Sequence, residues 1–533
     1  MEVEPLPPWP SIGCMFEDNA AHFGDAPAVI EGEMELSYRQ LLDAARAGAK
    51  SLLAAGIGPG DLVAFWAPNG WRWAVMAHAV WLVGGVVVPI SSRLKVLEAG
   101  PILERTAARI LFTVSECASV RFIESLHEAY GSDLSGLPAL KHLVHLDNDQ
   151  SFNCFLKSGV EIGDAVLAHA TDAIAGEDVC EIVFTSGTTG APKGVQLSHR
   201  QLMLSYWTWS GIGGLGFGDK YLVITPFSHG FGLNAGVIAS ALRGMCMVVL
   251  DVFEPERTMG LIRRHGINVM GGPPNLFARL MELPEVIANP PKSMRVAFLG
   301  AASVPMEILK RCRSVLGIER VINAYGLMEA CVVSMTRADD PPDVIAGTTG
   351  RALEAVEVKV ADDTGTPLPV GTPGEILVRS YGVMKGYWRD PAQTAFSLTA
   401  DGWFHTGDIG TIDPAGNITI VDRKKDMFIC GGFNAYPAEI ENLLLRIDGL
   451  SAVSVVAVPD ALRGEVPVAF VVPAANSGVG PDTVLAWAKR NIASYKVPRQ
   501  VHVVGALPLN ANGKVMKDVL KARAMGDKGR AAS

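Results

Sequence analysis

The chain has 533 residues, of which 49% are hydrophobic, and a formal net charge of −9. This length exceeds what one hydrophobic core usually organises, so the sequence predicts at least two domains. Charged residues make up only 19% of the chain and acidic ones prevail, which argues against the basic character that nucleic-acid binding requires. We expect no nucleic-acid partner.

The cysteines and the terminal segments bear on the cellular compartment. The eight cysteines are scattered and form no Cys-x-x-Cys pair, which favours reduced thiols over disulfides or zinc ligands. The N-terminal segment is acidic and rich in proline, so it lacks the basic and apolar regions of a signal peptide, and the last three residues are not a peroxisomal signal. We therefore expect a cytoplasmic protein.

The N-terminal region predicts alternating helices and strands. Ser37-Tyr-Arg-Gln40 has the form of a capping box, and the Ala/Leu-rich segment after it, closed by Gly56, predicts a helix. The following segments predict a strand, a helix and a strand at residues 61–66, 71–82 and 86–90. This alternation predicts an α/β fold with a parallel sheet.

The most apolar stretch of the chain, residues 73–90, is long enough to be weighed as a membrane span. His78 and the Gly84-Gly85 pair interrupt it, so we interpret it as a buried helix that leads into a buried strand. No transmembrane segment is predicted.

An apolar run at residues 180–184 opens into a loop rich in Gly, Ser and Thr. This pattern predicts a buried strand followed by a phosphate-binding loop, because glycines let successive backbone N–H groups point at one anion. A flexible linker is the alternative, and the spacing is not that of a Walker A loop, since Gly194 follows Lys193. The candidate phosphate-binding residues are Thr185, Ser186, Gly187, Thr188, Thr189, Gly190 and Lys193.

This strand and loop resemble the phosphate loop of the adenylate-forming enzymes, which include acyl-CoA synthetases, luciferases and nonribosomal-peptide adenylation domains. The resemblance continues in family order from about Ser37 to Lys517. It implies an α/β fold with a large N-terminal domain of mixed and parallel sheets flanked by helices, and a small, mobile α+β C-terminal domain. We expect a large domain at residues 1–421, a hinge at 422–426 and a small domain at 427–533, with the last ~10 residues disordered.

A strand is predicted at residues 221–225, followed by an aromatic segment around His229. An isolated histidine among aromatic residues is more often a core residue with satisfied hydrogen bonds. A matching segment lies beside the acyl site in the adenylate-forming family, so the resemblance implies that His229 orients the substrate. A role as a base is not expected, because a carboxylate carries no proton near neutral pH. The implied acyl-pocket residues are Phe227, His229, Phe231 and Gly232.

Two segments are implied to hold the adenine. Residues 296–303 predict a strand and a turn of small residues, which leaves room for a flat purine, with close helix–strand packing as the alternative. Residues 323–330 resemble the family's Tyr-Gly-x-Thr-Glu motif, in which the tyrosine ring can stack on adenine. The implied nucleotide-binding residues are Gly300, Ala301, Ala302, Asn323, Ala324, Tyr325 and Gly326.

The same motif implies a metal site. Glu329 offers a hard oxygen ligand for Mg²⁺, and by resemblance Thr185 supplies the other protein oxygen. Met328 departs from the family, which has threonine there, and a thioether cannot donate a hydrogen bond. We expect the lost donor to cost about 1–4 kcal/mol in the transition state, which predicts a slower enzyme rather than an inactive one.

The ribose of the nucleotide is implied to bind at two charged residues. A carboxylate in a glycine-rich turn can accept hydrogen bonds from two adjacent hydroxyls, although Thr406-Gly-Asp408 taken alone would be interpreted only as a turn. Because Asp408 and Arg423 match the family's ribose-binding residues, the resemblance implies this role for both.

The C-terminal region is implied to carry the moving parts. Lys425 matches the pivot of the small domain, and Gly431-Gly432 would let the pantetheine of CoA pass close to the backbone. Lys514 lies on an Asn-Gly turn, where a lysine is usually only a solubilising charge. The matching family lysine enters the active site and is needed for adenylation. The implied catalytic residues are Lys514, Glu329, Thr185 and His229.

The resemblance implies an acid:CoA ligase (AMP-forming) that uses ATP, Mg²⁺ and coenzyme A. An acyl-AMP ligase that transfers to a carrier protein or another acceptor is the alternative, and a non-catalytic acyl- or nucleotide-binding protein is a third reading motivated by Met328. The apolar acyl segment favours a fatty, alicyclic or aryl acid, and the segments at residues 225–232 and 425–439 resemble bacterial ligases for medium-chain or steroid-ring-derived acids. A homodimer is compatible with the sequence.

Overall fold

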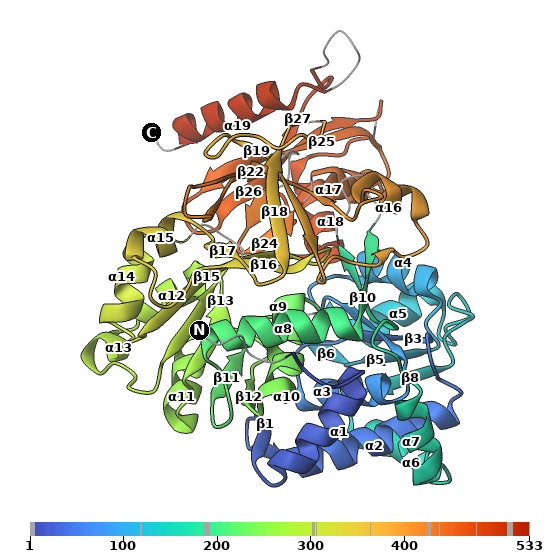
Figure 1. Ribbon diagram of the computed structural model, residues 1–533. Coiled ribbons are helices and arrows are strands. Elements are labelled where there is room, and N and C mark those ends of the chain that lie inside the picture. Colours follow the sequence, from blue (N-terminus) through green and yellow to red (C-terminus); the bar gives the residue numbers. More distant parts are fainter. Residues whose placement is uncertain are drawn as a thin grey trace. The chain divides into compact units, whose positions relative to one another are not determined.

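The computed structural model describes two compact units (Figure 1). The first comprises Met1–Ser92, Ile102–Phe184 and Gly194–Asp422, and the second comprises Arg93–Pro101, Thr185–Lys193 and Arg423–Ser533. The described residues are 6–117, 120–185, 192–300, 304, 306–362, 364–423, 428–435, 437–475, 477–508 and 515–531.

A mainly parallel seven-stranded sheet in the first unit carries the strand that enters the phosphate loop. β3 pairs in parallel with β4 and β5, β5 with β8, and β4 with β9, while β20 is antiparallel to β10. The order across the sheet is β20 (Gly386–Tyr387), β10 (Lys193–Ser198), β9 (Val179–Thr185), β4 (Val86–Ile90), β3 (Leu62–Trp66), β5 (Ile110–Thr113) and β8 (His142–His145).

A nine-stranded sheet carries the adenine-motif strand. Its central strands, from β1 through β12, β11, β13 and β14 to β15, are parallel, and antiparallel strands complete both edges. The order is β17 (Arg351–Ala352), β16 (Cys331–Met335), β15 (Arg320–Leu327), β14 (Val296–Leu299), β13 (Val269–Gly272), β11 (Lys220–Val223), β12 (Cys246–Val249), β1 (Pro27–Glu31) and β2 (Met34–Ser37).

A four-stranded sheet and a two-stranded ribbon complete the strands of the first unit. The former has the order β18 (Val356–Ala361), β19 (Gly374–Ser380), β21 (Phe404–Ile412) and β22 (Ile418–Arg423), and the latter joins β6 (Glu116–Cys117) to β7 (Val120–Arg121).

Helices accompany these sheets, as Figure 1 shows for α11 to α15 beside the nine-stranded sheet. They are α1 (Ile12–Phe23), α2 (Tyr38–Ala54), α3 (Trp71–Leu82), α4 (Val96–Thr106), α5 (Phe122–Tyr130), α6 (Asp149–Lys157), α7 (Asp164–Asp172), α8 (His199–Gly213), α9 (Gly230–Gly232), the π-helix η1 (Leu233–Ile238), α10 (Ala239–Arg243), α11 (Pro255–His265), α12 (Pro274–Met281), α13 (Pro284–Ala288), α14 (Met306–Ser314), α15 (Pro342–Gly347) and α16 (Pro391–Ser397). Of α4, the residues up to Pro101 belong to the second unit.

The predicted N-terminal elements are confirmed. The side chain of Ser37 accepts a hydrogen bond from the backbone N–H of Gln40, and the Gln40 side chain accepts one from Ser37 in return, so α2 begins with the predicted capping box. Every residue from Trp73 to Leu82 in α3 is buried, as is all of β4. The apolar stretch is therefore a core helix and strand, and no helix among the described residues is long and apolar enough to cross a membrane.

The second unit has its own sheet and core. β26 (Gly464–Pro473) pairs with β25 (Leu450–Asp460), β23 (Phe428–Cys430) and β27 (Gln500–Val503), and β24 (Phe433–Ala435) completes the sheet beside β23. The helices α17 (Pro437–Leu444), α18 (Pro481–Asn491) and α19 (Lys517–Ala531) accompany it. Valines of β25 and β26 pack with Ile440, Leu444, Leu520 and other apolar residues, which gives this unit an independent core.

Two predictions concern the boundary between the units and the end of the chain. The boundary between the units falls at Asp422 and Arg423, within the expected hinge, whose action as a hinge stays a prediction. α19 is described up to Ala531, and the expected disorder over the last ~10 residues stays a prediction.

A buried ion cluster lies within the second unit. The ammonium of Lys496 is 3.0 Å from a carboxylate oxygen of Glu98 and 2.5 Å from one of Glu439, and its side chain is 2% exposed. The second oxygen of Glu98 accepts hydrogen bonds from the backbone N–H groups of Ala493 (3.0 Å) and Lys95 (3.2 Å). Burial raises the pKa of Glu98, whereas the neighbouring carboxylates outweigh desolvation and raise the pKa of Lys496.

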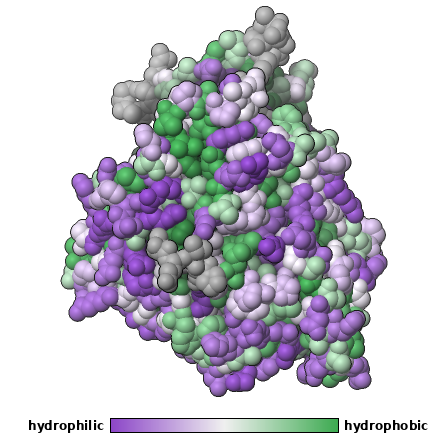
Figure 2. Space-filling model, viewed as in Figure 1, coloured by the Kyte–Doolittle hydropathy of each residue, from purple (hydrophilic) through white to green (hydrophobic). Residues whose placement is uncertain are grey.

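On the face shown in Figure 2, hydrophilic residues are spread between smaller apolar areas. Large apolar side chains that are strongly exposed include Leu462 (88%), Phe396 (77%) and Phe217 (66%). These three are far apart in sequence and belong to different elements or loops, as is ordinary for a globular surface.

Candidate active site

The ends of the predicted phosphate loop are described, and its middle is not. β9 ends at Thr185, whose hydroxyl donates a 3.5 Å hydrogen bond to the carbonyl of Lys193, the first residue of β10. A Cβ at Gly194 would lie 2.9 Å from the Ile182 side chain, so this glycine allows the two strands to approach each other. Ser186, Gly187, Thr188, Thr189 and Gly190 lie outside the described residues, and their contacts with phosphate stay a prediction.

A tight hairpin presents the candidate metal ligand. β15 and β16 pair Gly326 with Val332 and Leu327 with Cys331, which leaves three residues, Met328 to Ala330, in the turn. Cys331 has a φ of 52°, a conformation that closes such a turn. The carboxylate of Glu329 therefore stands on a rigid tip at the end of the adenine-motif strand.

Glu329 is held from a third strand. The phenol of Tyr387 donates a 3.1 Å hydrogen bond to a carboxylate oxygen of Glu329, and the N–H of Met384 donates to its carbonyl at 2.8 Å. Tyr387 lies on β20, whose partner is β10, the strand that leaves the phosphate loop. Sequence reasoning missed Tyr387, because nothing in the chain near residue 387 marks it as a neighbour of residue 329.

The structure joins two residues that were predicted separately. The phenol of Tyr325 donates a 2.5 Å hydrogen bond to a carboxylate oxygen of Asp408, which is only 1% exposed. The N–H of Asp408 donates to the hydroxyl of Thr406 at 3.0 Å. A buried carboxylate needs such donors, and the contact fixes the ring of Tyr325 relative to the carboxylate. This pairing places the expected adenine and ribose contacts side by side.

The remaining adenine-motif residues have structural partners. The side-chain amide of Asn323 donates to the carbonyl of Thr348 at 2.7 Å, and its backbone N–H donates to the hydroxyl of Thr336 at 2.8 Å. A Cβ at Gly300 would lie 3.3 Å from the carbonyl oxygen of Ala324, so the two predicted turns are neighbours. Ala301 and Ala302 lie outside the described residues.

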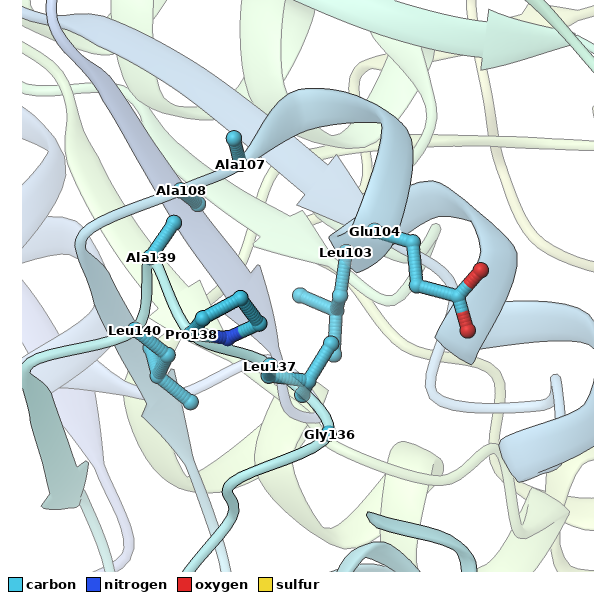
Figure 3. A pocket seen from close by; sticks show the side chains of 9 residues that line it. All are labelled: Leu103, Glu104, Ala107, Ala108, Gly136, Leu137, Pro138, Ala139 and Leu140. Atoms are coloured by element: carbon cyan, nitrogen blue, oxygen red, sulfur yellow. The ribbon is translucent and has the colours of Figure 1, made fainter.

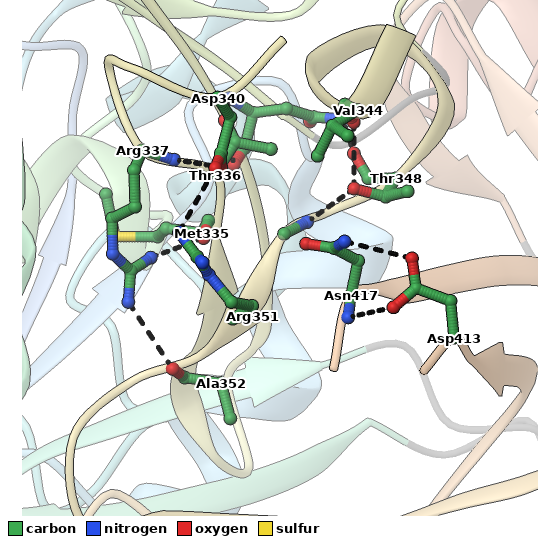
Figure 4. Close-up of polar contacts among 12 residues, drawn as sticks. Met335, Thr336, Arg337, Asp340, Val344, Thr348, Arg351, Ala352, Asp413 and Asn417 are labelled. Carbon is green, nitrogen blue, oxygen red and sulfur yellow. Dashed lines mark hydrogen bonds and ion pairs between the residues drawn. The ribbon is translucent and has the colours of Figure 1, made fainter. Parts of the chain in front are cut away.

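Figure 4 shows the polar contacts that brace this region. The N–H of Arg337 donates to Asp340 at 2.6 Å, and the Arg351 guanidinium pairs with the same carboxylate at 3.1 Å. Nearby, the side-chain amide of Asn417 donates to Asp413 at 2.9 Å. These contacts fix the loops behind the Tyr325 strand without using the predicted site residues.

The predicted acyl segment forms a compact turn. His229 caps α9, and its Nδ1 accepts a 3.1 Å hydrogen bond from the N–H of Phe231. A Cβ at Gly232 would lie 2.1 Å from the Pro226 carbonyl oxygen, so only glycine fits there. The ring of Phe227 is 1% exposed and packs in the core, and its place in an acyl pocket stays a prediction.

The imidazole of His229 is accessible to water, yet desolvation lowers its pKa below the ordinary value of 6.5. Water reaches this side chain from one side while protein atoms surround it on the others, so it is both exposed and partly desolvated. His229 is therefore neutral at physiological pH, as a residue that orients a substrate through hydrogen bonds can be.

Met328 lies against the acyl turn. A Cβ at Gly230 would be 2.9 Å from the sulfur of Met328 and 3.4 Å from the Asn234 amide nitrogen. The thioether therefore occupies space beside His229, where the family's threonine is shorter and polar.

The C-terminal candidates are only partly described. Gly431 and Gly432 have φ values of 60° and 86° and form the two-residue turn between β23 and β24. Such a turn needs glycine for its backbone alone, so passage of CoA stays a prediction. The backbone of Arg423 ends β22, and its side chain, with Lys425 and Lys514, lies outside the described residues.

None of the predicted site residues lines the hollow of about 340 Å³ that Figure 3 shows in the first unit. Its lining is mostly Ala, Leu and Pro from the end of α4 and the loop before β8, with Glu104 at one side. The carboxylate of Glu104 accepts a 2.6 Å hydrogen bond from Tyr130, so no set of polar groups converges on this space.

The donors present suit Mg²⁺ better than a transition metal. Among the described residues no group of three or more His, Cys, Asp and Glu side chains could hold a metal ion. Mg²⁺ commonly takes one or two protein oxygens and several from phosphates, which fits the Glu329 carboxylate together with a hydroxyl. Because Thr185 and Glu329 belong to different units, their joint binding of one ion stays a prediction.

Comparison with known families gives two matches in chain order. Residues 16–388 match the family described as AMP-binding enzyme, and residues 439–514 match the AMP-binding enzyme C-terminal domain. The first match contains the phosphate loop, the acyl turn and the Tyr325–Glu329 motif, and the second contains Lys514.

Known relatives match over nearly the full length. A 3-[(3aS,4S,7aS)-7a-methyl-1,5-dioxo-octahydro-1H-inden-4-yl]propanoyl:CoA ligase of Mycobacterium tuberculosis is 40% identical, with 93% of this chain and 96% of that protein covered. A medium-chain fatty-acid–CoA ligase of Escherichia coli is 29% identical, with 96% and 90% covered. A solved structure of an o-succinylbenzoate CoA synthetase double mutant from Bacillus subtilis, bound to a product analogue, has a TM-score of 0.81 and 26% identity, with 96% and 98% covered.

The predicted resemblance to adenylate-forming enzymes is thus confirmed by the family matches and by relatives that cover almost all of the chain. The chain belongs to the AMP-binding enzyme family.

Proposed function

We propose that the chain is an AMP-forming acid:CoA ligase, which joins a carboxylic acid to the α-phosphate of ATP and then transfers the acyl group to CoA. The observation that carries this proposal is the 40% identity to a propanoyl:CoA ligase over 93% of the chain. The Tyr325–Asp408 hydrogen bond and the braced Glu329 support it, because these residues match the nucleotide-binding motifs that the resemblance implies.

The chemistry requires charge neutralisation more than proton transfer. A carboxylate must approach a phosphate that is also negative, so catalysis depends on positioned donors and positive charge. In our proposal the loop from Thr185 to Lys193 holds the phosphates, and Asp408 binds the ribose hydroxyls while Tyr325 fixes that carboxylate. Bound Mg²⁺ would offset phosphate charge, with Glu329 and Thr185 as its protein ligands.

The neutral His229 suits contact with the acid. At a pH where its imidazole carries no charge, it orients the carboxylate without fixing it as an ion pair. In our proposal Lys514 supplies positive charge during adenylation, and rotation at Lys425 exchanges it for the CoA thiol. Both lysines have these roles by their match to the family.

The acid that we propose is apolar and ring-containing, with a short propanoate side chain. Two relatives, from Mycobacterium tuberculosis and Rhodococcus jostii, carry the name of the same bicyclic propanoyl:CoA ligase and are 40% and 39% identical to this chain. Medium-chain fatty-acid and feruloyl ligases are less similar, at 29% and 32%. A bicyclic propanoate is therefore the first substrate to test, with medium-chain and aryl acids after it.

The test is a panel of acids at saturating ATP, Mg²⁺ and CoA, with AMP, pyrophosphate and thioester measured together. We expect thioester formation that needs both acid and CoA, with the highest kcat/KM for the bicyclic propanoate. Pyrophosphate release that is unchanged when CoA is omitted would instead favour transfer to another acceptor. Binding of ATP without pyrophosphate release for any acid would favour the non-catalytic reading.

A matched variant separates the half-reactions. Lys514→Ala should abolish formation of acyl-AMP but retain thioester formation from synthetic acyl-AMP and CoA, because the lysine serves only the first step in our proposal. Loss of both half-reactions to the same degree would contradict this assignment.

We also propose a cytoplasmic enzyme, since none of the eight cysteines forms a disulfide bond. A homodimer stays a prediction, which light scattering of the purified chain would test.

A further inference from the structure

A buried glutamate lies on the strand that enters the phosphate loop. Glu181 is on β9, four residues before Thr185, and pairs across the sheet with Val87 of β4. It is 0% exposed, and neither of its carboxyl oxygens has a hydrogen-bond partner among the described residues. A carboxyl group in this position is costly to the fold, which marks it as a candidate for a functional role.

The groups around Glu181 come from three other elements. Asn234 of η1 lies close enough for its amide to lower the pKa of Glu181, although no hydrogen bond forms. Tyr206 of α8 and Cys331 of β16 lie close enough to interact electrostatically with Glu181. Asn234 is 1% exposed, and its Oδ1 has no hydrogen-bond partner among the described residues. Like the carboxyl oxygens of Glu181, it is a buried polar atom without a hydrogen bond.

These neighbours belong to the predicted acyl turn. The phenol of Tyr206 donates a 3.4 Å hydrogen bond to the carbonyl of Gly230, next to His229. Asn234 follows His229 by five residues and lies in η1, a π-helix, which is a conformation frequent at functional sites. Tyr206 and Asn234 thus connect the interior around Glu181 to the segment that carries His229, Phe231 and Gly232.

Glu181 is the group of this cluster that titrates near neutral pH. Burial raises its pKa to about 8, well above the ordinary value of 4.5. Burial also raises the pKa of Tyr206 and of Cys180 well above their ordinary values and that of Cys331 to about 12, so these groups stay neutral. The pKa of His229 is lowered instead, and it adds no titration above pH 7.

We propose that Glu181 is a positioning residue for the carboxylic acid, which acts through Asn234 and Tyr206 to hold the turn His229–Ile238 against the strand that enters the phosphate loop. The proposal deepens the proposed function and rests on it. With its proton bound, the carboxyl group packs beneath the turn as a neutral group. Loss of the proton places an unpaired charge in the core, and the turn must open or shift to solvate it.

The first test follows the turn itself and needs no substrate. Hydrogen–deuterium exchange of the peptide covering residues 229–238 is compared at pH 6.5 and pH 9 in the wild type and in Glu181→Gln, which stays neutral. We expect equal exchange in the two proteins at pH 6.5 and at least threefold faster exchange in the wild type at pH 9. A peptide of α2 serves as the internal reference for the intrinsic effect of pH.

The second test measures the KM for the acid as a function of pH. Because the fraction of neutral Glu181 falls about tenfold between pH 7 and pH 9, the KM for the acid should rise about tenfold in the wild type over that range. In Glu181→Gln it should change less than twofold, with kcat and the KM for ATP similar to those of the wild type at pH 7. A purely structural role would change the melting temperature and leave the pH profile of the KM untouched.

Glu177→Gln is the matched control, since this glutamate is exposed, precedes the same strand and forms a surface ion pair with Lys385. It should retain the alkaline rise in KM.

Equal exchange of residues 229–238 in the wild type and Glu181→Gln at pH 9, or the same alkaline rise in both, would overturn the proposal. If Glu181→Gln does not fold, the wild type alone tests the proposal. Between pH 6.5 and pH 9, the exchange of residues 229–238 must then increase more than that of the α2 peptide. If no acid is turned over, the proposed function fails while the exchange test still decides the role of Glu181.

Discussion

Replacement of Lys496 by methionine is the sharpest stability test that the structure offers. The ammonium group, 2% exposed, lies between the carboxylates of Glu98 and Glu439 at 3.0 and 2.5 Å. Lys496→Met keeps the length and apolar stem of the side chain, but it leaves two acidic groups buried without their counter-ion. Burial already raises the pKa of Glu98, and loss of the ammonium removes the largest influence that lowers it.

The magnitude follows from the burial of all three groups. Removal of one partner of a buried ion pair typically costs about 3–5 kcal/mol, since the remaining charge cannot reach water. The second unit has roughly 130 residues, which corresponds to an unfolding entropy of about 0.27 kcal/mol/K. The melting temperature of this unit should therefore fall by about 11–18 °C.

The assay is differential scanning calorimetry of the full chain at pH 7 and a fixed scan rate. Two further variants are compared with Lys496→Met. The neutral triple variant Lys496→Met, Glu98→Gln, Glu439→Gln should recover most of the loss, because no unpaired charge remains. Lys521→Met removes a lysine of the same unit whose partner is 4.0 Å away at the surface, and it should change the melting temperature by less than about 2 °C.

A drop below about 3 °C for Lys496→Met would refute the reasoning, because it would mean that the cluster is open to water. The same conclusion would follow if the triple variant were as unstable as the single one, since the loss would then come from packing rather than charge.

Three further variants test the active site. Tyr325→Phe removes a donor to the buried Asp408, so kcat/KM for ATP should fall about 10- to 100-fold, and a decrease under threefold would contradict the assigned contact. Gly232→Ala places a Cβ about 2.1 Å from the Pro226 carbonyl oxygen, so the KM for the acid should rise at least tenfold while ATP binding, measured by calorimetry, changes little. Met328→Thr restores the family's hydroxyl and should raise the rate of pyrophosphate release about tenfold, whereas a lower rate would show that the thioether itself serves the acyl site.

Local patterns in the sequence were sufficient for many elements. The capping box at Ser37 and the buried helix and strand after Gly70 were predicted close to their observed bounds. Such features depend on residues within a few positions of each other, so the chain near them carries the whole signal. The same holds for the glycine-rich loop after Phe184, which identified the family.

Contacts between distant residues could not be predicted in this way. Tyr325 and Asp408 are 83 positions apart, and Tyr387 reaches Glu329 only because β20 pairs with β10. The motifs marked Tyr325, Glu329 and Asp408 singly but not their partners, and only the folded sheets bring the partners within hydrogen-bonding distance.

The sequence by itself determined the α/β class, the family and the order of its motifs, because backbone preferences and short-range spacing encode them. The tertiary structure alone decided which buried groups face one another, including Glu181 beneath the acyl turn and Lys496 between two glutamates. The physical reason is that desolvation and charge pairing depend on everything within a few ångströms of a group, and those neighbours come from strands and helices far apart in the chain.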